Sequence, residues 1–210
     1  LTEHGDGYRW LPGATPAPQP APAPQPSRPS HNLPEYRDDF FGRTDELAQL
    51  TERIEQGERL ITILGMGGLG KTRLAVQLAE ILQETVSGCW MVDCAAARDA
   101  EGITVALGHA LQTPLKAAPV PQLGDVLRAH GSVVVIFDNM EALIPHVSET
   151  LGRWLTLAPE ATFIATSRRR LGLSGERLFP LSPLSAEDAT ALFYSRARMF
   201  RPSLEETPEN

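Results

Sequence analysis

A glycine-rich stretch that ends in a lysine and a threonine has the clearest potential for chemistry in this sequence. Gly65–Thr72 matches the pattern G-x-x-x-x-G-K-[ST] without a gap, between an apolar run and an amphipathic stretch. Glycines let successive backbone N–H groups turn toward an anion without a Cβ clash, and the positive end of a following helix faces the same anion. The pattern therefore predicts a loop that binds nucleotide phosphates, rather than a glycine-rich turn that precedes a Lys-Thr pair by chance.

Two side chains of this loop have separate expected roles. Lys71 would place its charge on the β- and γ-phosphates, and the Thr72 hydroxyl would ligate Mg²⁺. ATP or ADP with Mg²⁺ is therefore the expected ligand. The residues of this stretch that we expect to contact the nucleotide are Gly65, Met66, Gly67, Gly68, Leu69, Gly70, Lys71, Thr72 and Arg73.

An acidic residue follows a second apolar run. Val133–Phe137 has the continuous apolar character of a strand buried on both faces, and Asp138 comes next. A carboxylate at the C-terminal end of such a strand lies where ligands bind, and we expect it to hold Mg²⁺, directly or through water. The alternative is an N-cap for a helix that starts near Met140. Glu141 could orient an attacking water, and a first-turn acid favoured by the helix dipole is an equally good interpretation of it.

A third apolar strand, Thr162–Ser167, ends in Arg168. The strand end brings this guanidinium to the same edge of the sheet as Lys71 and Asp138, where it could bind the γ-phosphate through two hydrogen bonds and report its presence. A solvated basic loop is the alternative, and we favour it for the two arginines that follow. The catalytic residues expected from these patterns are Lys71, Asp138, Glu141 and Arg168.

The elements that must position these residues alternate between strands and helices. Short apolar runs predict five strands, at Leu60–Leu64, Cys89–Asp93, Val133–Phe137, Thr162–Thr166 and Leu178–Leu181. Helical patterns are expected from a Thr44 cap to Gly57, from about Lys71, over 101–111 and 122–130, along Leu143, Val147, Leu151 and Trp154, and from a Ser185 cap with Ala189, Leu192, Phe193 and Ala197 facing the core. This alternation predicts an α/β fold, with a parallel sheet flanked by helices and right-handed crossovers.

Composition limits the classes of function. The chain of 210 residues is 42% hydrophobic, enough for a core, and its net charge of -7 disfavours nucleic-acid binding by the chain as a whole. No apolar run reaches the roughly 18 residues that span a bilayer, and the N-terminus lacks a signal-peptide pattern. Cys89 and Cys94 lie at an odd offset in one predicted strand, so we expect two buried, unbonded thiols in a cytoplasmic protein with no membrane partner.

A proline-rich stretch divides the chain. Half of its 18 prolines fall within residues 12–34, so we expect an extended, disordered linker there and a folded part that starts near Tyr36. Residues 1–11 are similar to the closing hairpin of winged-helix DNA-binding domains, and a glycine-rich turn is an equally good interpretation of them.

The motifs together resemble one family. Phe41-Gly42-Arg43-x-x-Glu46-Leu47, the loop with its Lys-Thr-Arg-Leu-Ala continuation, Phe137-Asp138-Asn139-x-Glu141, Ala165–Glu176 and Leu181–Phe193 occur in order. Over about residues 38–200 they resemble the NB-ARC-type signal-transduction ATPases, the STAND class, in the form found in bacterial transcriptional regulators. The resemblance implies an NB-ARC-like P-loop NTPase domain over 36–200, with the strand order 2-3-4-1-5.

The resemblance also implies how such a domain works. Gly42 and Arg43, which composition alone would describe as packing and a surface arginine, would line the nucleotide pocket. ADP would hold the protein closed, ATP would open it to self-associate, and slow ATP hydrolysis would reset the switch. The family's adenine-contacting Gly-Leu-Pro-Leu-Ala segment would follow the last residue, so residues 201–210 are expected to be a truncated tail, and the fragment to bind nucleotide but hydrolyse it poorly.

Three functions fit these patterns. A nucleotide switch within a transcriptional regulator is the leading one, and it would reach DNA only through an N-terminal domain outside this chain. A defence-type STAND effector shares the same core. A P-loop kinase acting on a small molecule is disfavoured by the motifs around Arg168 and Ser185, and no pattern marks an acceptor site.

Overall fold

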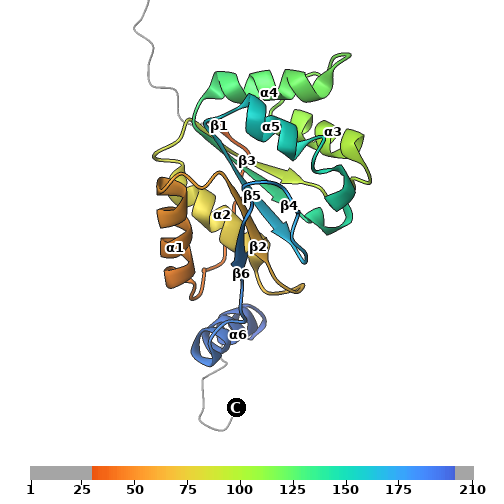
Figure 1. The fold of residues 1–210 in the computed structure, drawn as a ribbon. Coiled ribbons are helices and arrows are strands. Elements are labelled where there is room, and N and C mark those ends of the chain that lie inside the picture. Colours follow the sequence, from red (N-terminus) through yellow and green to blue (C-terminus); the bar gives the residue numbers. More distant parts are fainter. Residues whose placement is uncertain (1–29, 202–210) are drawn as a thin grey trace, which may run out of the picture.

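A parallel sheet forms the centre of the molecule. The computed structural model describes residues 30–201, so the expectations for residues 1–11, for 12–29 and for 202–210 lie outside it. Within this range six strands pair in the order β1-β3-β4-β5-β2-β6, and every pairing is parallel (Figure 1). The strands are β1 (Ser30–His31), β2 (Leu60–Leu64), β3 (Gly88–Asp93), β4 (Val133–Asp138), β5 (Ala161–Ser167) and β6 (Arg177–Pro180). The five expected strands are present in the expected order 2-3-4-1-5, and the fold class is confirmed.

The sixth strand corrects the expected start of the ordered chain. β1 pairs with β3 at the edge of the sheet, within the segment expected to be a linker. Asn32 follows it, and its side chain both donates to the Met91 carbonyl (3.0 Å) and accepts from the Met91 amide (2.6 Å). These two bonds extend the pairing along β3, so ordered structure begins before Tyr36. Proline content indicated a linker, but it carried no information on edge pairing.

Helices cover both faces of the sheet, as Figure 1 shows. The α-helices are α1 (Thr44–Glu55), α2 (Lys71–Leu82), α3 (Ala100–Ala110), α4 (Pro119–His130), α5 (Leu151–Leu157) and α6 (Ala186–Phe200). α1 and α2 pack on one face, against side chains such as Val134 and Ile136, whereas α3, α4 and α5 pack on the other, against Val135 and Phe137. Consecutive residues of β4 thus enter opposite cores, as pleated backbone requires.

Two helix predictions need correction. Thr44 is the first residue of α1 and not its cap, because Arg43 takes the N-cap position in a left-handed conformation (φ 67°). The single helix expected from Leu143 to Trp154 is instead two 3-10 turns, Met140–Ala142 and Ile144–His146, followed by α5. Pro145 lies in the second turn, and without an N–H it cannot donate back to the first turn, so the two turns do not merge into one α-helix.

The two cysteines are buried on opposite sides of the sheet. Cys89 belongs to the core beneath α1 and α2, and Cys94 belongs to the core beneath α3, α4 and α5. Both are free thiols, as expected, and burial raises the pKa of each to about 12. They are therefore protonated and inert at neutral pH.

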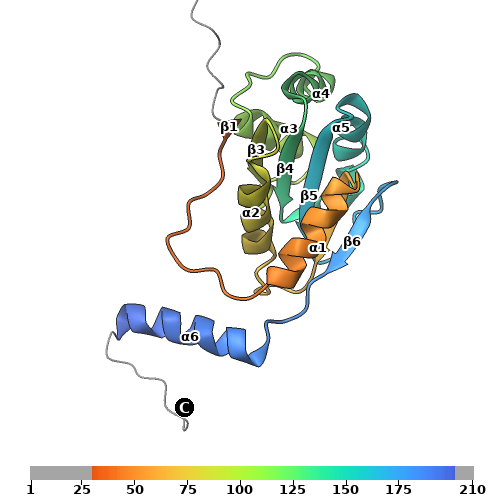
Figure 2. The ribbon, with the colours of Figure 1, turned by 90° about the vertical axis from the view of Figure 1, so that its left-hand side faces the viewer.

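Helix α6 stands apart from the two helical layers. It lies beyond the end of the sheet in both perpendicular views (Figures 1 and 2). Ser185 caps it as expected, with its Oγ accepting from the Asp188 amide at 3.0 Å. The face expected to be buried is largely exposed, since Phe193 is 64% exposed and Tyr194 is the buried residue of this helix. The periodicity identified an apolar stripe, but no core lies beneath it in the described residues.

None of the helices between residues 30 and 201 combines the length and the apolar character needed to cross a membrane.

Candidate nucleotide site

The glycine-rich loop connects β2 to α2 at the C-terminal edge of the sheet. Gly68 (φ 83°) and Gly70 (φ 85°) both adopt left-handed conformations, which glycine enters without a Cβ penalty. Gly70 is also the N-cap of α2, so the unpaired amides of the first helical turn point toward the loop. The Lys71 ammonium donates to the Met66 carbonyl at 2.9 Å and lies across the loop's own backbone. The local sequence thus forms the expected anion cradle.

Beneath the loop, Asp138 is held by two threonines. Its Oδ1 accepts from the Thr72 hydroxyl at 2.7 Å and from the Thr166 hydroxyl of the neighbouring strand. The carboxylate is only 5% exposed, so these bonds offset the loss of water. The following 3-10 turn has no side-chain cap and begins after Asn139. The hydrogen bonds of Asp138 therefore connect it to the loop, not to the helix end that was its alternative role.

Thr166 is a site residue that the sequence reasoning missed. Its hydroxyl donates to Asp138 and accepts from the Asn139 amide at 3.1 Å, so it fixes the backbone just after the carboxylate. The signal was present, because Thr166 is a polar residue near the C-terminal end of an otherwise apolar strand. Only the β4–β5 register, with Phe137 opposite Ala165, places it beside Asp138.

The structure brings Arg168 and Glu141 together at the loop. Arg168 Nε lies 3.3 Å from Glu141 Oε1, and the Arg168 side chain is 57% exposed. Its Nη2 is so near the loop that a Cβ placed on Gly67 would come within 3.3 Å of it. Arg168, Glu141 and the glycine-rich loop thus meet at one edge of the sheet. The long, exposed side chain of Arg168 lies between the Glu141 carboxylate and the loop.

Arg43 occupies a different environment from the one expected of a surface residue. It is 8% exposed and forms an ion pair with Glu46 (2.6 Å). Its Nη2 also donates to the carbonyls of Leu69 (3.4 Å) and Ser182 (2.7 Å). Arg43 therefore joins the loop to the segment that leads into α6.

Gly42 permits this arrangement. It has φ 63°, and a Cβ at this position would lie 2.6 Å from Asp188 Oδ2. Any other residue would be strained by the backbone and would collide with the first turn of α6. Gly42 thus lets the chain before α1 approach the first turn of α6 closely.

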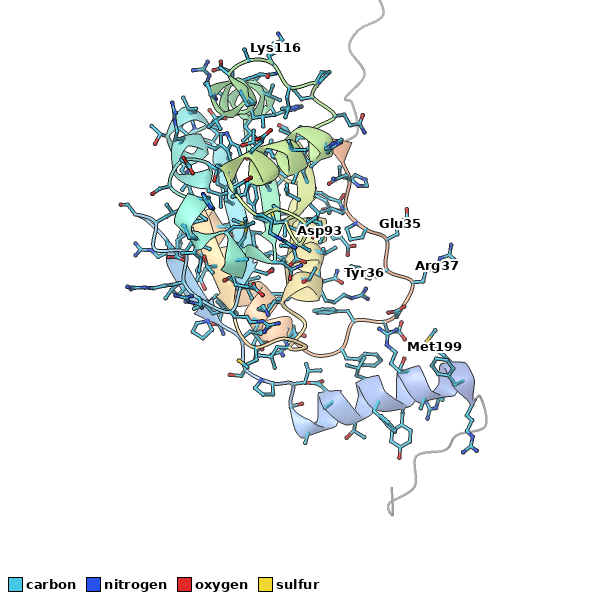
Figure 3. All side chains as sticks on the ribbon, turned by 90° about the vertical axis from the view of Figure 1, so that its right-hand side faces the viewer. Glu35, Tyr36, Arg37, Asp93, Lys116 and Met199 are labelled. Carbon is cyan, nitrogen blue, oxygen red and sulfur yellow. The ribbon has the colours of Figure 1, made fainter. Side chains whose placement is uncertain are left out.

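Arg73 is held by the segment before α1. Its guanidinium lies 3.9 Å from the centroid of the Tyr36 ring and donates to the Asp38 carbonyl, while its Nη1 is buried without a hydrogen-bond partner. Figure 3 shows Tyr36 and its neighbours on the irregular segment that runs past α2 toward α6. The Asp38 carboxylate in turn pairs with Arg196 of α6. Tyr36 and Asp38 belong to no motif, so their contribution was not predicted from the sequence.

The donor set fits Mg²⁺. The carboxylate of Asp138 and the hydroxyl of Thr72 are hard oxygen ligands within 2.7 Å of one another, directly beneath the phosphate cradle. Mg²⁺ in such sites binds few protein oxygens and takes the rest from phosphates and water.

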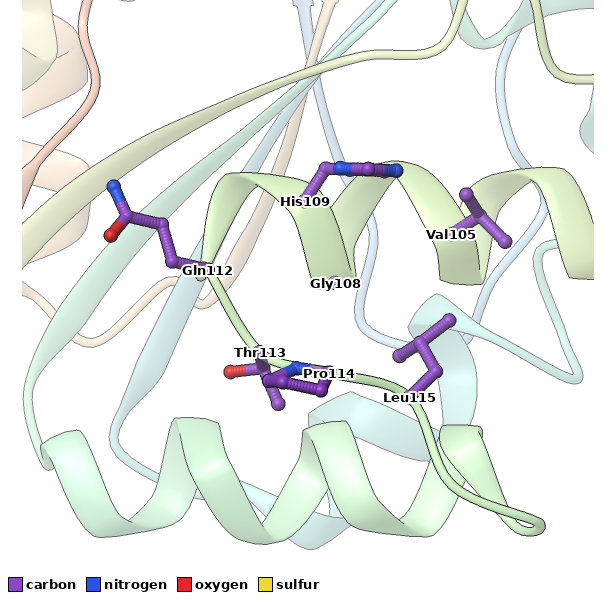
Figure 4. A pocket seen from close by; sticks show the side chains of 7 residues that line it. All are labelled: Val105, Gly108, His109, Gln112, Thr113, Pro114 and Leu115. Carbon is purple, nitrogen blue, oxygen red and sulfur yellow. The ribbon is translucent and has the colours of Figure 1, made fainter.

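Cavities among the described residues differ in their lining. One of about 340 Å³ is lined by Gly42, Arg43, Ser185 and Asp188, so it adjoins two of the predicted nucleotide-binding residues. Another of about 290 Å³ lies between α3 and the loop after it, and Val105, His109, Gln112 and Leu115 line it (Figure 4). It contains none of the predicted site residues and no convergent charged groups. The loop edge therefore remains the site where functional groups meet.

A parallel sheet with a glycine-rich loop after one strand, and an acid and an arginine at the ends of two others, defines a P-loop NTPase. The family model described as "AAA domain" matches residues 53–168, from α1 to the end of β5 and Arg168. The chain belongs to this family of P-loop ATPase domains.

Two mycobacterial relatives are similar in sequence. An uncharacterized protein of Mycobacterium tuberculosis is 31% identical over 175 residues, which cover 81% of this chain and 44% of the relative. A second protein of that organism, named as a candidate HTH-type transcriptional regulator, is 32% identical over 148 residues, or 69% of this chain and 16% of the relative. The chain thus spans less than half the length of these relatives.

Solved structures share the fold. Cdc6p from Pyrobaculum aerophilum has a TM-score of 0.56 at 17% identity, covering 83% of this chain and 52% of that one. A chain of the Drosophila ORC bound to DNA has a TM-score of 0.59 at 17% identity, covering 76% and 48%. At such identities the likeness establishes the architecture alone.

Proposed function

We propose that this chain is the nucleotide-binding switch of an NB-ARC-like, STAND-type protein, and that the parent protein is a bacterial transcriptional regulator. The observation that carries the proposal is the position of Arg168. It lies next to Gly67 of the phosphate cradle and is paired with Glu141, while Asp138 and Thr72 are joined on the other side of the loop. A site so arranged can bind a nucleotide and respond to its terminal phosphate.

The proposed binding step exchanges internal partners for phosphate. Lys71 leaves the Met66 carbonyl for the phosphates, and the amides at the start of α2 bind the same anion. Thr72 and Asp138 hold Mg²⁺, which when bound neutralises charge on the phosphates. Arg43, which joins Leu69 to Ser182, lines the nucleotide pocket together with Gly42. Arg73, in the first turn of α2, packs on the Tyr36 ring and so bounds the pocket on the side of that helix.

Arg168 is the proposed reader of ATP. Its guanidinium is 57% exposed and bound to a single carboxylate, so it can move to a γ-phosphate at small cost. ADP offers no such partner, and Arg168 then stays with Glu141. Glu141 is released when Arg168 moves, and it becomes free to orient a water for slow hydrolysis. The two states of this pair would distinguish ATP from ADP.

The relative named as a candidate HTH-type regulator supports the regulatory context, as do the family motifs. In this view DNA binding and self-association belong to the whole parent protein, since the chain of 210 residues has a net charge of -7.

The test is the affinity of Arg168→Ala for two nucleotides. Charge-assisted bidentate hydrogen bonds contribute roughly 1.5–3 kcal/mol, so a non-hydrolysable ATP analogue should bind about 10- to 150-fold more weakly, while ADP binding stays nearly constant. Calorimetry measures both. Arg169→Ala, next in the chain, is the matched control and should leave both affinities unchanged. Equal losses for ATP and ADP in Arg168→Ala would refute the proposal.

A further inference from the structure

The connection between β5 and β6 has an unusual path for a parallel sheet. The two strands flank β2 on opposite sides, and all three run in the same direction (Figure 1). Residues 168–176 must therefore return from the C-terminal end of β5 to the N-terminal end of β6, and they contain no helix. Leu171 is 3% exposed and belongs to the core beneath α5, so the connection crosses β2 on that face. Arg168 is its first residue.

A single carboxylate holds this crossover together. Glu176 Oε1 accepts from the Thr62 hydroxyl and from the Leu171 amide, each at 2.7 Å, and Oε2 accepts from the Gly172 amide at 2.7 Å. Thr62 is fully buried in the middle of β2. A carboxylate that accepts three short hydrogen bonds is a strong local anchor. Glu176, at the end of the crossover, therefore connects the middle of the crossover to β2.

Strand β2, whose Thr62 donates to Glu176, also leads into the phosphate loop. β2 ends at Leu64, and Gly65 follows with its amide donating to the Ser167 carbonyl at 3.2 Å. Ser167 directly precedes Arg168. The sensor arginine is thus tied to the loop strand on one side by this backbone bond, and on the other by Glu176 through Leu171 and Gly172. Without the second tie, the chain after Arg168 would be held by the Arg169 amide, which donates to Ser167 Oγ at 3.1 Å, and by the apolar packing of Leu171 and Leu173.

We propose that Glu176 is the positioning residue for Arg168. By binding the crossover backbone to Thr62, it keeps the arginine aimed at the phosphate loop and thereby sets the preference for ATP over ADP. This proposal rests on the sensor role of Arg168. Glu176 bonds to Thr62 and to the backbone of its own loop, and it acts on Arg168 through that backbone.

The experiment compares ATP-analogue and ADP affinities in a set of variants of this chain. Glu176→Gln keeps the size of the side chain but places an NH₂ group against a backbone donor. Thr62→Val keeps the shape of the strand residue and removes one hydrogen bond, so it tests the same anchor if Glu176→Gln folds poorly. Thr104→Val is the matched control, because Thr104 is also buried and bonds only within α3, to the Ala100 carbonyl at 2.6 Å.

Glu176→Gln should weaken ATP-analogue binding by about three- to tenfold and ADP binding by less than about twofold, since it loosens one charged hydrogen bond. Thr62→Val should act in the same direction, and Thr104→Val should leave the ratio of affinities unchanged. Combined with Arg168→Ala, Glu176→Gln should have no additional effect on that ratio, a non-additivity that loss of stability alone does not produce.

Two results would overturn the inference in distinguishable ways. If Arg168→Ala lowers the ratio but Glu176→Gln and Thr62→Val do not, Glu176 is a loop anchor without influence on the sensor, and the proposed function stands. If Arg168→Ala itself leaves the ratio unchanged, the sensor role fails and the positioning role falls with it.

Discussion

At the scale of single residues, the site depends on groups that are bonded to each other before any ligand is considered. Asp138 is nearly buried and shares its Oδ1 between Thr72 and Thr166, while its Oδ2 accepts from Asn139 at 3.2 Å. Each of these donors fixes the orientation of the carboxylate. Preorganisation of this kind lowers the cost of binding a cation, because the ligands need not be ordered afterwards.

Asp138→Asn should therefore reduce the Mg²⁺ dependence of ATP binding. The amide removes the charge and presents an NH₂ group to the threonine hydroxyls, so the gain in ATP affinity on adding Mg²⁺ should fall by about tenfold. ADP binding without metal should change little. Titrations with and without Mg²⁺ measure both.

Asp93→Asn is the control for that variant. Asp93 ends the neighbouring strand in register with Asp138, yet it is exposed and bonds the Ala95 amide at 2.9 Å. If Asp138→Asn lowers the affinity for both nucleotides equally, whether or not metal is present, the carboxylate serves the structure of the loop and not the metal.

At the scale of elements, α6 is attached to the domain by polar contacts more than by a core. Arg196 pairs with the Asp38 carboxylate, and the Asp38 carbonyl accepts from Arg73, directly after the phosphate loop. Arg43 provides the second link, from Leu69 to Ser182. Both links start at the nucleotide site, so the position of α6 is coupled to the loop through named contacts.

Arg196→Ala should loosen α6 and leave the sheet intact. Removing the ion pair should speed amide hydrogen exchange across Ala186–Phe200 by at least about twofold, as expected for an exposed pair. Arg128→Ala removes a comparable exposed pair with Asp125 on α4 and is the control. Unchanged exchange in α6 would mean that the pair does not hold the helix.

The same pair gives α6 a dependence on pH. The hydrogen bond from Arg196 lowers the pKa of Asp38 below its ordinary value, and this outweighs the opposing effect of burial. A carboxyl whose pKa is lowered by folding stabilises the folded state above its ordinary pKa, and that stabilisation is lost as pH falls through the lowered value. Exchange in α6 should therefore accelerate in acid below the usual carboxyl range, and Arg196→Ala should remove that dependence.

At the scale of the whole molecule, this chain is one part of a larger arrangement in its relatives, of which it spans less than half. Helix α6 lies beyond the end of the sheet (Figure 2), and it carries exposed apolar residues, Phe193 among them. In the proposed switch, the bound nucleotide would change the position or exposure of such peripheral surfaces. The parent protein is therefore the proper object of an assembly test.

We expect the parent protein to self-associate when it binds an ATP analogue and to remain in a smaller form with ADP. Lys71→Ala should abolish the difference, because it removes the charge that holds the β- and γ-phosphates without touching the core. Light scattering on the two proteins with each nucleotide measures this. An ATP-dependent increase in mass that persists in Lys71→Ala would exclude the loop as its cause.

Much of the fold and the phosphate loop could be read from local sequence. Gly65–Thr72, the apolar strands and the acid and arginine at their ends are contiguous patterns, and the conformation of each depends on neighbours in the chain. The helix expected from Leu143 to Trp154 failed locally, where the chain forms two 3-10 turns with Pro145 in the second. The burial expected of α6 failed for another reason, since an apolar stripe specifies a face and not its partner.

What sequence alone determined is therefore the set of groups that could bind a nucleotide and the edge of the sheet at which they gather. The tertiary structure alone decided their partners. Thr166 meets Asp138 through the register of two strands, Arg43 reaches Ser182 across 139 residues of chain, and Glu176 finds Thr62 across 114. Such contacts depend on how strands align and where loops cross, and no spacing within a short stretch of residues encodes either.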